Sequence, residues 1–305
     1  MTTKSPMTKF TIKEFQKMFP DDDTCLEYLR REWFPELITC EGCKREARFY
    51  RITTRKVYGC EHCGYQISPT AGTIFHKSPT PLTTWFYVIY QMSKSLNGIS
   101  AKQIQRETGV TYKCAWRMCA QVRKMLDEGN DPLSGEVEMD ESYYGGEEKN
   151  KHANKRTANN QGRSTKTKKP VFGMIERGGK LSANVVDNVK SETLLPIVLA
   201  NIEEGTQVYT DEFNAYNLLQ RSGYKHAVIP HGQRIYVMDR VHTNTIEGFW
   251  SLSKNGIRGT YHAFSDKYLP NYIDEYSFRY NHRNDVIPMF LTFLSRVKVL
   301  GKAVS

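Results

Sequence analysis

The sequence lacks the features that define several classes of protein. It has no run of roughly 18 apolar residues, as a membrane-spanning helix requires, and its start (MTTKSPMTKFTIKEF) has no apolar signal segment. The Gly-x-Gly-x-x-Gly motif of dinucleotide-binding folds is also absent. With 21 glycines and 12 prolines among 305 residues, neither a fibrous repeat nor disorder along the whole chain is credible. We therefore expect a folded cytoplasmic protein with no membrane association.

Acidic residues are in deficit. The chain has 33 Asp and Glu residues against 43 Lys and Arg residues, a net charge of +10. Such an excess favours a polyanionic partner such as nucleic acid, while the polar mean hydropathy of −0.58 argues against a membrane surface. The length suggests about two domains.

Cysteines are few and unevenly placed. Four of the seven form two pairs, Cys40-Glu-Gly-Cys43 and Cys60-Glu-His-Cys63, with 16 residues between the pairs. Two such turns can present four thiolates tetrahedrally to one Zn²⁺ ion, whereas redox pairs or plain buried thiols are the alternative. The intervening ARFYRITTRKVYG alternates like a hairpin, so residues 36–68 approximately are predicted to form a zinc ribbon with His62 exposed. The other three cysteines are expected to be buried or on helix faces: Cys25, Cys114 and Cys119.

Helical patterns follow the ribbon. A core helix is predicted from Pro81, and Ser100 and Thr111 are expected to cap two further helices with Gly109 at the bend between them. This layout is typical of a helix-turn-helix, and a plain helical hairpin with solvated charges is the alternative. Trp116 is expected in the core in either case. In a helix-turn-helix, the second helix would offer three residues to a DNA groove: Tyr112, Lys113 and Arg117.

Strand patterns begin after Asp131, which places the main boundary near residue 130. In GEVEMDESYYGG, apolar Val137 and Met139 alternate with acidic residues, which predicts a strand that carries one carboxylate, Asp140, to its end. The order β-β-β-α-β-α-β-α follows, a mixed α/β arrangement with an antiparallel first half. Asp211 is expected to end the fourth strand.

A basic segment, residues 149–169, lies between the first two of these strands. It contains eight Lys or Arg residues and no acid. Its composition predicts a disordered loop that condenses on a phosphate backbone, and a solvated insertion without a partner is the alternative. The candidate phosphate contacts here are Lys166, Lys168 and Lys169.

Asp140, Asp211 and Glu247 are the candidate catalytic carboxylates. Attack on a phosphodiester builds negative charge on the attacking and leaving oxygens, and two Mg²⁺ or Mn²⁺ ions held by carboxylates stabilise both. Glu247 lies in a predicted helix after the last strand. Lys254 follows it by seven residues, which at about 100° per residue is the same helix face. That helix is expected to pack on the sheet through Phe249, Trp250 and Leu252.

The ribbon, the capped helices and three segments, VEMDESYYGG, VYTDEFNAY and HTNTIEGFWSLSKNGIRGTYH, resemble the DDE transposases of the IS1595 family, the ISXO2-like group. The resemblance runs from about residue 20 to about residue 295. It implies an RNase H-like catalytic domain with Asp140, Asp211 and Glu247 as the metal-binding triad and Lys254 as the accompanying basic residue. Arg258, in the third segment, is a further candidate DNA contact. Three residues of the C-terminal helix are candidates for either a structural or a DNA-binding role: Arg279, Asn281 and Arg283.

The expected function is that of an insertion-sequence transposase. It would bind double-stranded DNA at terminal inverted repeats, cleave it and join the ends to target DNA, acting as a homo-oligomer associated with the nucleoid. The alternatives are a DNA-binding regulator and an RNase H-like nuclease that does not join ends. The expected domains are residues 1–78 with the ribbon, 79–130 with the helix-turn-helix and 131–305 with the catalytic fold.

Overall fold

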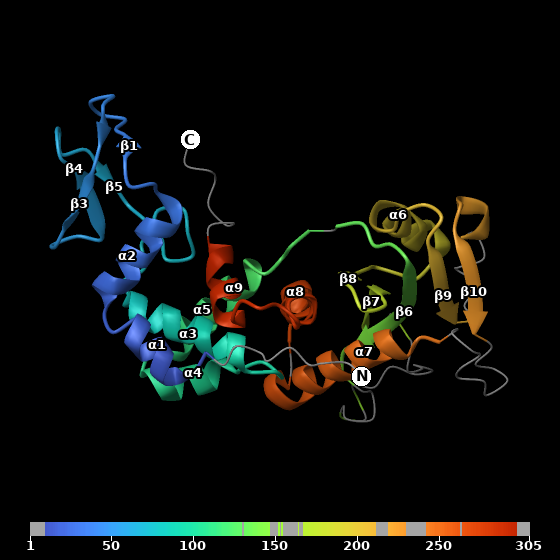
Figure 1. Cartoon of the computed structure of the whole chain (residues 1–305). Helices are drawn as coiled ribbons and strands as arrows, with labels where there is room; N and C mark the ends of the chain where they lie inside the picture. Colours follow the sequence, from blue (N-terminus) through green and yellow to red (C-terminus); the bar gives the residue numbers. More distant parts are fainter. Residues whose placement is uncertain are drawn as a thin grey trace. The chain divides into compact units, whose positions relative to one another are not determined.

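The chain divides into two compact units (Figure 1). The computed structural model describes residues 10–129, 131–146, 167–211, 219–229, 242–262 and 264–297, and also residues 152, 154 and 164. The first unit comprises Met1–Ser95, Ile99–Leu126 and Asn284–Ser305, and the second comprises Leu96–Gly98 and Asp127–Arg283. The end of the chain joins the first unit because α9 (Met289–Ser295) packs on α3 (Leu82–Lys94). No helix in the described ranges is long and apolar enough to cross a membrane.

The first unit begins with two capped helices and a ribbon of short strands. Thr11 caps α1 (Ile12–Met18) and Asp21 caps α2 (Asp22–Trp33). In the ribbon, β1 (Ile38–Thr39) pairs with β2 (Glu46–Ala47), and β4 (Val57–Cys60) pairs with β3 (Phe49–Ile52) and β5 (Gln66–Ile67), all antiparallel. The predicted hairpin between the cysteine pairs is therefore confirmed.

The predicted helices after the ribbon are present as α3, α4 (Ala101–Thr108) and α5 (Tyr112–Lys124). Ser100 and Thr111 accept backbone N–H groups of Gln103 and Cys114 as caps, and Gly109 turns the chain at a φ of 71°. The expectation that Trp116 is a core residue is wrong, because Trp116 is half-buried. The buried residues of α5 are Ala115, Met118, Cys119, Val122 and Arg123.

The second unit is built on a five-stranded mixed sheet in the order β10-β9-β6-β7-β8. Its strands are β6 (Glu136–Tyr144), β7 (Lys169–Glu176), β8 (Leu181–Val185), β9 (Gln207–Asp211) and β10 (Lys225–Ile229). The first three are antiparallel, while β9 runs parallel to both β6 and β10. The mixed α/β class with an antiparallel first half is therefore confirmed. The helix predicted directly after Asp211 lies outside the described residues.

Helices cover both faces of the sheet. On one face, α6 (Ser191–Asn201) buries Leu194 and Val198 against Val137 and Met139 of β6. On the other face, α7 (Asn244–Gly256) and α8 (Leu269–Asn281) pack against Val171 and Ile175 of β7. Because side chains alternate along the strands, the apolar residues that contact α6 lie on one face of the sheet and those that contact α7 lie on the opposite face.

Glycine makes the close approach of α7 to the sheet possible. A Cβ on Gly173 of β7 would lie only 2.6 Å from the Trp250 ring of α7. The ring therefore occupies the space above Gly173, and the register of α7 over β6 and β7 is fixed at this point.

Asp140 does not end its strand, contrary to the sequence prediction. The strand β6 continues to Tyr144, because residues 140–144 pair with β7 as far as Tyr144↔Lys169. What stops near Asp140 is the parallel pairing with β9, whose last pair is Glu138↔Tyr209.

Candidate active site and metal centre

The four ribbon cysteines form a cluster suited to one metal ion. Their Sγ atoms all lie within 4.8 Å of one another, with separations of 3.5 Å for Cys40 and Cys63 and 3.9 Å for Cys43 and Cys60. Tetrahedral zinc with bonds of about 2.3 Å places its sulfurs about 3.8 Å apart. Together with the ribbon strands around it, this cluster supports a structural zinc site.

The two cysteine turns have equivalent backbones. The N–H of Lys44 donates to the carbonyl of Cys40 (2.7 Å), and the N–H of Gly64 donates to that of Cys60 (3.0 Å). Both donors have left-handed φ values, 58° and 72°. His62 is exposed, as predicted, so the four thiols complete the ligand set without it.

The thiol of Cys40 is prepared for a metal by its backbone. Burial raises its pKa, but N–H donors from Cys43 and Gly42, together with hydrogen bonds from the thiols of Cys63 and Cys60, outweigh that effect and lower the pKa to about 7. A thiol that ionises near neutral pH is a good zinc ligand, since the thiolate is the form that binds.

The strand register brings Asp140 and Asp211 together. Each lies two residues beyond the last β6–β9 pair, Glu138↔Tyr209, so both are on the same face where the two parallel strands part. Asp211 ends β9, as predicted. The helix α7 crosses the same face of the sheet with Glu247 in its first turn.

The electrostatics of Asp140 reflect this arrangement. Burial, followed by the neighbouring charges of Asp211 and Glu247, raises the pKa of Asp140 to about 7, although the Trp250 Nε1–H group donates to its Oδ2 at 3.0 Å. In the described part of the chain, only the cysteines form a group of metal-ligating atoms within 4.8 Å. Asp211 and Glu247 therefore each lie near enough to Asp140 to repel its charge, but the three carboxylates are not gathered as closely as the ligands of a single ion.

Lys254 lies near Asp140, and two further basic residues, Arg258 and Lys168, lie near Lys254. Burial lowers the pKa of Lys254, the charges of Arg258 and Lys168 lower it further, and Asp140 raises it. The Lys254 ammonium also lies 5.9 Å from the ring centroid of Tyr144. Lys169 begins β7, whereas Lys166 lies outside the described residues.

The three predicted DNA-reading residues are exposed on α5 in the first unit: Tyr112, Lys113 and Arg117. The ammonium of Lys102, on α4, lies 4.7 Å from the Tyr112 ring centroid, so the two helices are linked at their outer surface. Arg117 lies 6.0 Å from the ring centroid of Trp85.

Sequence reasoning missed a buried carboxylate, Glu138, beside this site. Glu138 has no exposed surface and accepts a hydrogen bond from the Arg177 Nε at 2.7 Å. The alternation that placed Asp140 on one face of the strand also placed Glu138 there, but only one carboxylate of the strand was interpreted as functional. The signal in the sequence was a second acid, two residues before Asp140, on the same face of the strand.

The candidate residues near the C-terminal helix have structural contacts. Arg279 pairs with the fully buried Glu275, and Asn281 exchanges hydrogen bonds with both backbone groups of Leu181 on β8. Arg283 donates to the carbonyls of Gly179 and Tyr280. Asn281 and Arg283 therefore fasten the end of α8 to the β7–β8 hairpin, whereas the Arg279–Glu275 pair lies within α8.

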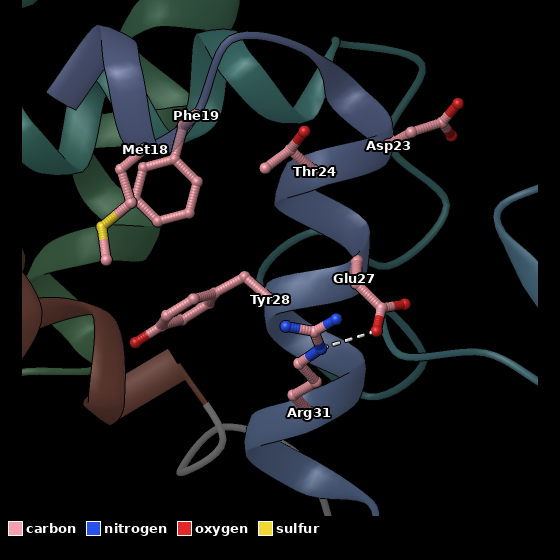
Figure 2. Close-up of a pocket in the computed structure, with 7 residues that line it drawn as sticks. All are labelled: Met18, Phe19, Asp23, Thr24, Glu27, Tyr28 and Arg31. Carbon is pink, nitrogen blue, oxygen red and sulfur yellow. Dashed lines mark hydrogen bonds and ion pairs between the residues drawn. The ribbon is translucent and has the colours of Figure 1, made fainter.

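A surface pocket of about 460 Å³ lies in the first unit, where α1 ends beside α2 (Figure 2). The ion pair of Arg31 and Glu27 (2.8 Å) forms part of its wall, next to the Tyr28 ring. None of the predicted catalytic, metal-binding or DNA-binding residues lines it.

Two family models match the chain. Residues 132–281 match an ISXO2-like transposase domain and residues 20–66 match a transposase zinc-ribbon domain. The chain is 30% identical over 245 residues to an uncharacterized protein in transposable element ISH50 of Halobacterium salinarum, covering 76% of this chain and 82% of that protein. It is also 30% identical over 103 residues to an uncharacterized transposase-like protein of Haemophilus influenzae, covering 34% of this chain and 82% of that one.

Among solved structures, the comparison gives a weak match. A chain in the cryo-EM structure of the simian T-cell lymphotropic virus intasome in complex with a PP2A regulatory subunit aligns over 57% of this chain and 63% of its own length. The sequence identity is 12% and the TM-score 0.29, a likeness too low to support an argument about the fold.

Proposed function

Because the chain belongs to the IS1595 family of ISXO2-like transposases, we propose that it binds the terminal inverted repeats of an insertion sequence, cleaves the DNA there and joins the freed ends to target DNA. A transposase-family domain implies a nucleic-acid-cleaving enzyme that binds DNA. We also propose that the second unit has an RNase H-like fold and that its carboxylates are the catalytic residues; the last residues of the chain, from Asn284, belong to the first unit and not to this fold.

The observation that supports the proposal is that Asp140, Asp211 and Glu247 lie near one another on one face of the mixed sheet, where β6 and β9 part. The strand register sets the two aspartates side by side, and the charges of Asp211 and Glu247 raise the pKa of Asp140, after burial itself. Such mutual repulsion is relieved by cations, and carboxylate oxygens are the ligands that Mg²⁺ and Mn²⁺ prefer. These residues would hold two such ions.

The roles of the side chains follow from the chemistry. When bound, the metal ions stabilise negative charge on the attacking and leaving oxygens of the phosphodiester. The Trp250 indole orients the Asp140 carboxylate, and the Thr243 hydroxyl donates to Oε1 of Glu247 at 3.2 Å. Lys254, Arg258 and Lys168 would hold phosphates of the cleaved strand beside Asp140, because cations near that carboxylate match a polyanion that approaches it.

DNA recognition is assigned to the first unit. We interpret α4 and α5 as a helix-turn-helix in which Tyr112, Lys113 and Arg117 read the repeat, since all three are exposed near the start of α5. The basic segment, residues 149–169, would add affinity without sequence preference. Both ends of an element must be held together for joining, so we expect the protein to act on the nucleoid as a homo-oligomer.

The test is cleavage and joining of defined DNA. Sequencing the DNA that flanks the gene identifies its inverted repeats, and duplexes that carry them are incubated with the purified protein and Mn²⁺. We expect nicks at the repeat ends and, with pre-cut ends, joining to a target plasmid. Cleavage without joining indicates a nuclease. Repeat-specific binding without either reaction indicates a regulator, and both outcomes contradict the proposal.

A further inference from the structure

The first turn of α7 is held by the sheet and not by a local cap. Thr243, the residue before the helix, makes no side-chain cap bond, and its hydroxyl instead donates to Glu247. Oε2 of Glu138, on β6, accepts the backbone N–H groups of Thr245 (2.8 Å) and Ile246 (3.1 Å). These groups are among the first N–H groups of a helix, which have no partner within it. The carboxylate from β6 therefore fixes where α7 begins, directly before Glu247.

The second oxygen of Glu138 ties in the segment that leads to the helix. Oε1 accepts the Arg177 Nε (2.7 Å) and the Thr245 hydroxyl (2.9 Å). Arg177 also donates to the carbonyl of His242 (2.8 Å), and its guanidinium lies 4.2 Å from the ring centroid of Tyr209. A carboxylate with no exposed surface is stable only with such partners, so its geometry is tightly defined.

Glu138 and Asp140 share one face of β6, and α7 contacts both. Glu138 holds the first turn of the helix, while Asp140 accepts the Trp250 indole N–H at 3.0 Å one turn further on. Glu247 lies between these two attachment points along α7. Its position relative to Asp140 therefore depends on the Glu138 attachment and on the indole bond.

We propose that Glu138 is the positioning residue for the metal site. Through the N-terminus of α7, and with Arg177 as its partner, it sets the position of Glu247 relative to Asp140. The inference rests on the proposed metal-dependent cleavage by these carboxylates. It assigns to Glu138 no contact with metal or DNA.

The test measures metal dependence, because an effect on folding alone lowers the amount of active protein without changing the metal requirement. In the full-length protein with zinc bound, Glu138→Gln keeps the size of the side chain but removes its charge. We expect the Mn²⁺ concentration for half-maximal cleavage to rise about tenfold, with the rate at saturating Mn²⁺ near that of the wild type. Hydrogen exchange at Thr245 and Ile246 should also become faster.

Glu275→Gln is the matched control. Glu275 is another fully buried carboxylate of the same unit that is paired with an arginine, and its described partners are Arg279 and the Tyr261 hydroxyl. This variant should lose thermal stability and keep the wild-type Mn²⁺ midpoint. If the Glu138 variant does not fold, Thr245→Val, which removes only the hydroxyl donor, decides the question: a rise of about threefold in the midpoint supports the proposal.

The outcomes separate this inference from the proposed function. If Glu138→Gln folds and cleaves DNA with the wild-type Mn²⁺ midpoint, the positioning role is overturned and the transposase assignment stands. If Glu138→Gln does not fold, an unchanged Mn²⁺ midpoint in Thr245→Val has the same meaning. Absence of Mn²⁺-dependent cleavage in the wild type overturns the proposed function, and the positioning role with it.

Discussion

Single carboxylates and a single lysine have separable roles in the proposed site. Asp140→Ala, Asp211→Ala and Glu247→Ala should each lower cleavage in Mg²⁺ or Mn²⁺ by at least about 1,000-fold, because each removes a proposed metal ligand. Binding of repeat DNA should remain nearly unchanged. Lys254→Ala leaves the ligands in place and removes a phosphate partner, so we expect a loss of only about 10- to 100-fold. Gel-based cleavage assays and binding titrations on the same preparations make the comparison.

The identity of the third ligand can be tested on one helix. Asn244 lies three residues before Glu247, at the start of α7, and both side chains are exposed. Because the charge of Glu247 contributes to the raised pKa of Asp140, we expect Glu247→Gln to be inactive and Asn244→Ala to cleave normally. A dead Asn244 variant beside an active Glu247 variant would move the site by one helical turn.

Another aspartate gives a pH dependence that is separate from catalysis. Burial, and then the charge of Asp127, raises the pKa of Asp274 on α8 to about 7. Between about pH 4 and pH 7 the folded protein keeps a proton that the unfolded chain has released, so stability falls as the pH rises through this window.

Asp274→Asn removes that loss. We expect the variant to exceed the wild type in the free energy of unfolding by about 1 kcal/mol at pH 8, a value discounted for partial solvent screening, and to match it near pH 4. Urea unfolding at both pH values measures this. The exposed Asp266 provides the control, since Asp266→Asn should show no such difference.

At the scale of elements, the zinc ribbon is held by its metal and by its contacts with α2. The ribbon side chains Arg51 and Tyr58 bond Asp23 and Glu27 of α2, both at 2.7 Å. The ribbon strands have four residues at most, too few to bury a core of their own.

Cys43→Ser should therefore release the zinc and unfold the ribbon, while the separate second unit keeps its unfolding transition. Elemental analysis and calorimetry test this, and zinc retained in both Cys43→Ser and Cys60→Ser would contradict the site.

The helix α5 yields a test of DNA reading. If Lys113 and Arg117 contact base edges, replacing either by alanine should reduce the preference for repeat over random DNA by about 1–3 kcal/mol. Lys124, exposed at the other end of α5, is the matched control, since its replacement should leave the preference intact. Should both variants keep the preference, α4 and α5 are a packing element.

The elements also show how far sequence patterns reach. The cysteine turns, the caps Ser100 and Thr111 and the mixed sheet were predictable, because each depends on residues close together in the sequence or on simple alternation. The extension of β6 beyond Asp140 was not, since it depends on pairing with β7 across the basic segment. The attachment of α7 by Glu138 joins residues more than 100 positions apart, and the half-burial of Trp116 depends on which face of α5 packs inward.

For the whole molecule, the net charge of +10 predicts binding that depends strongly on salt. We expect the replacement of Lys166, Lys168 and Lys169 by glutamine to weaken binding to every duplex by about the same factor. If each of these lysines neutralises one phosphate, the slope of log affinity against log salt should become shallower by about 3, at roughly 0.9 per contact. The preference for repeat DNA should not change, because phosphate contacts carry no sequence information.

Titrations of repeat and random duplexes at several salt concentrations measure both the salt slope and the preference for repeat DNA. An unchanged slope would mean that the basic segment is a solvated insertion, whereas a selective loss of repeat binding would mean that it contacts bases.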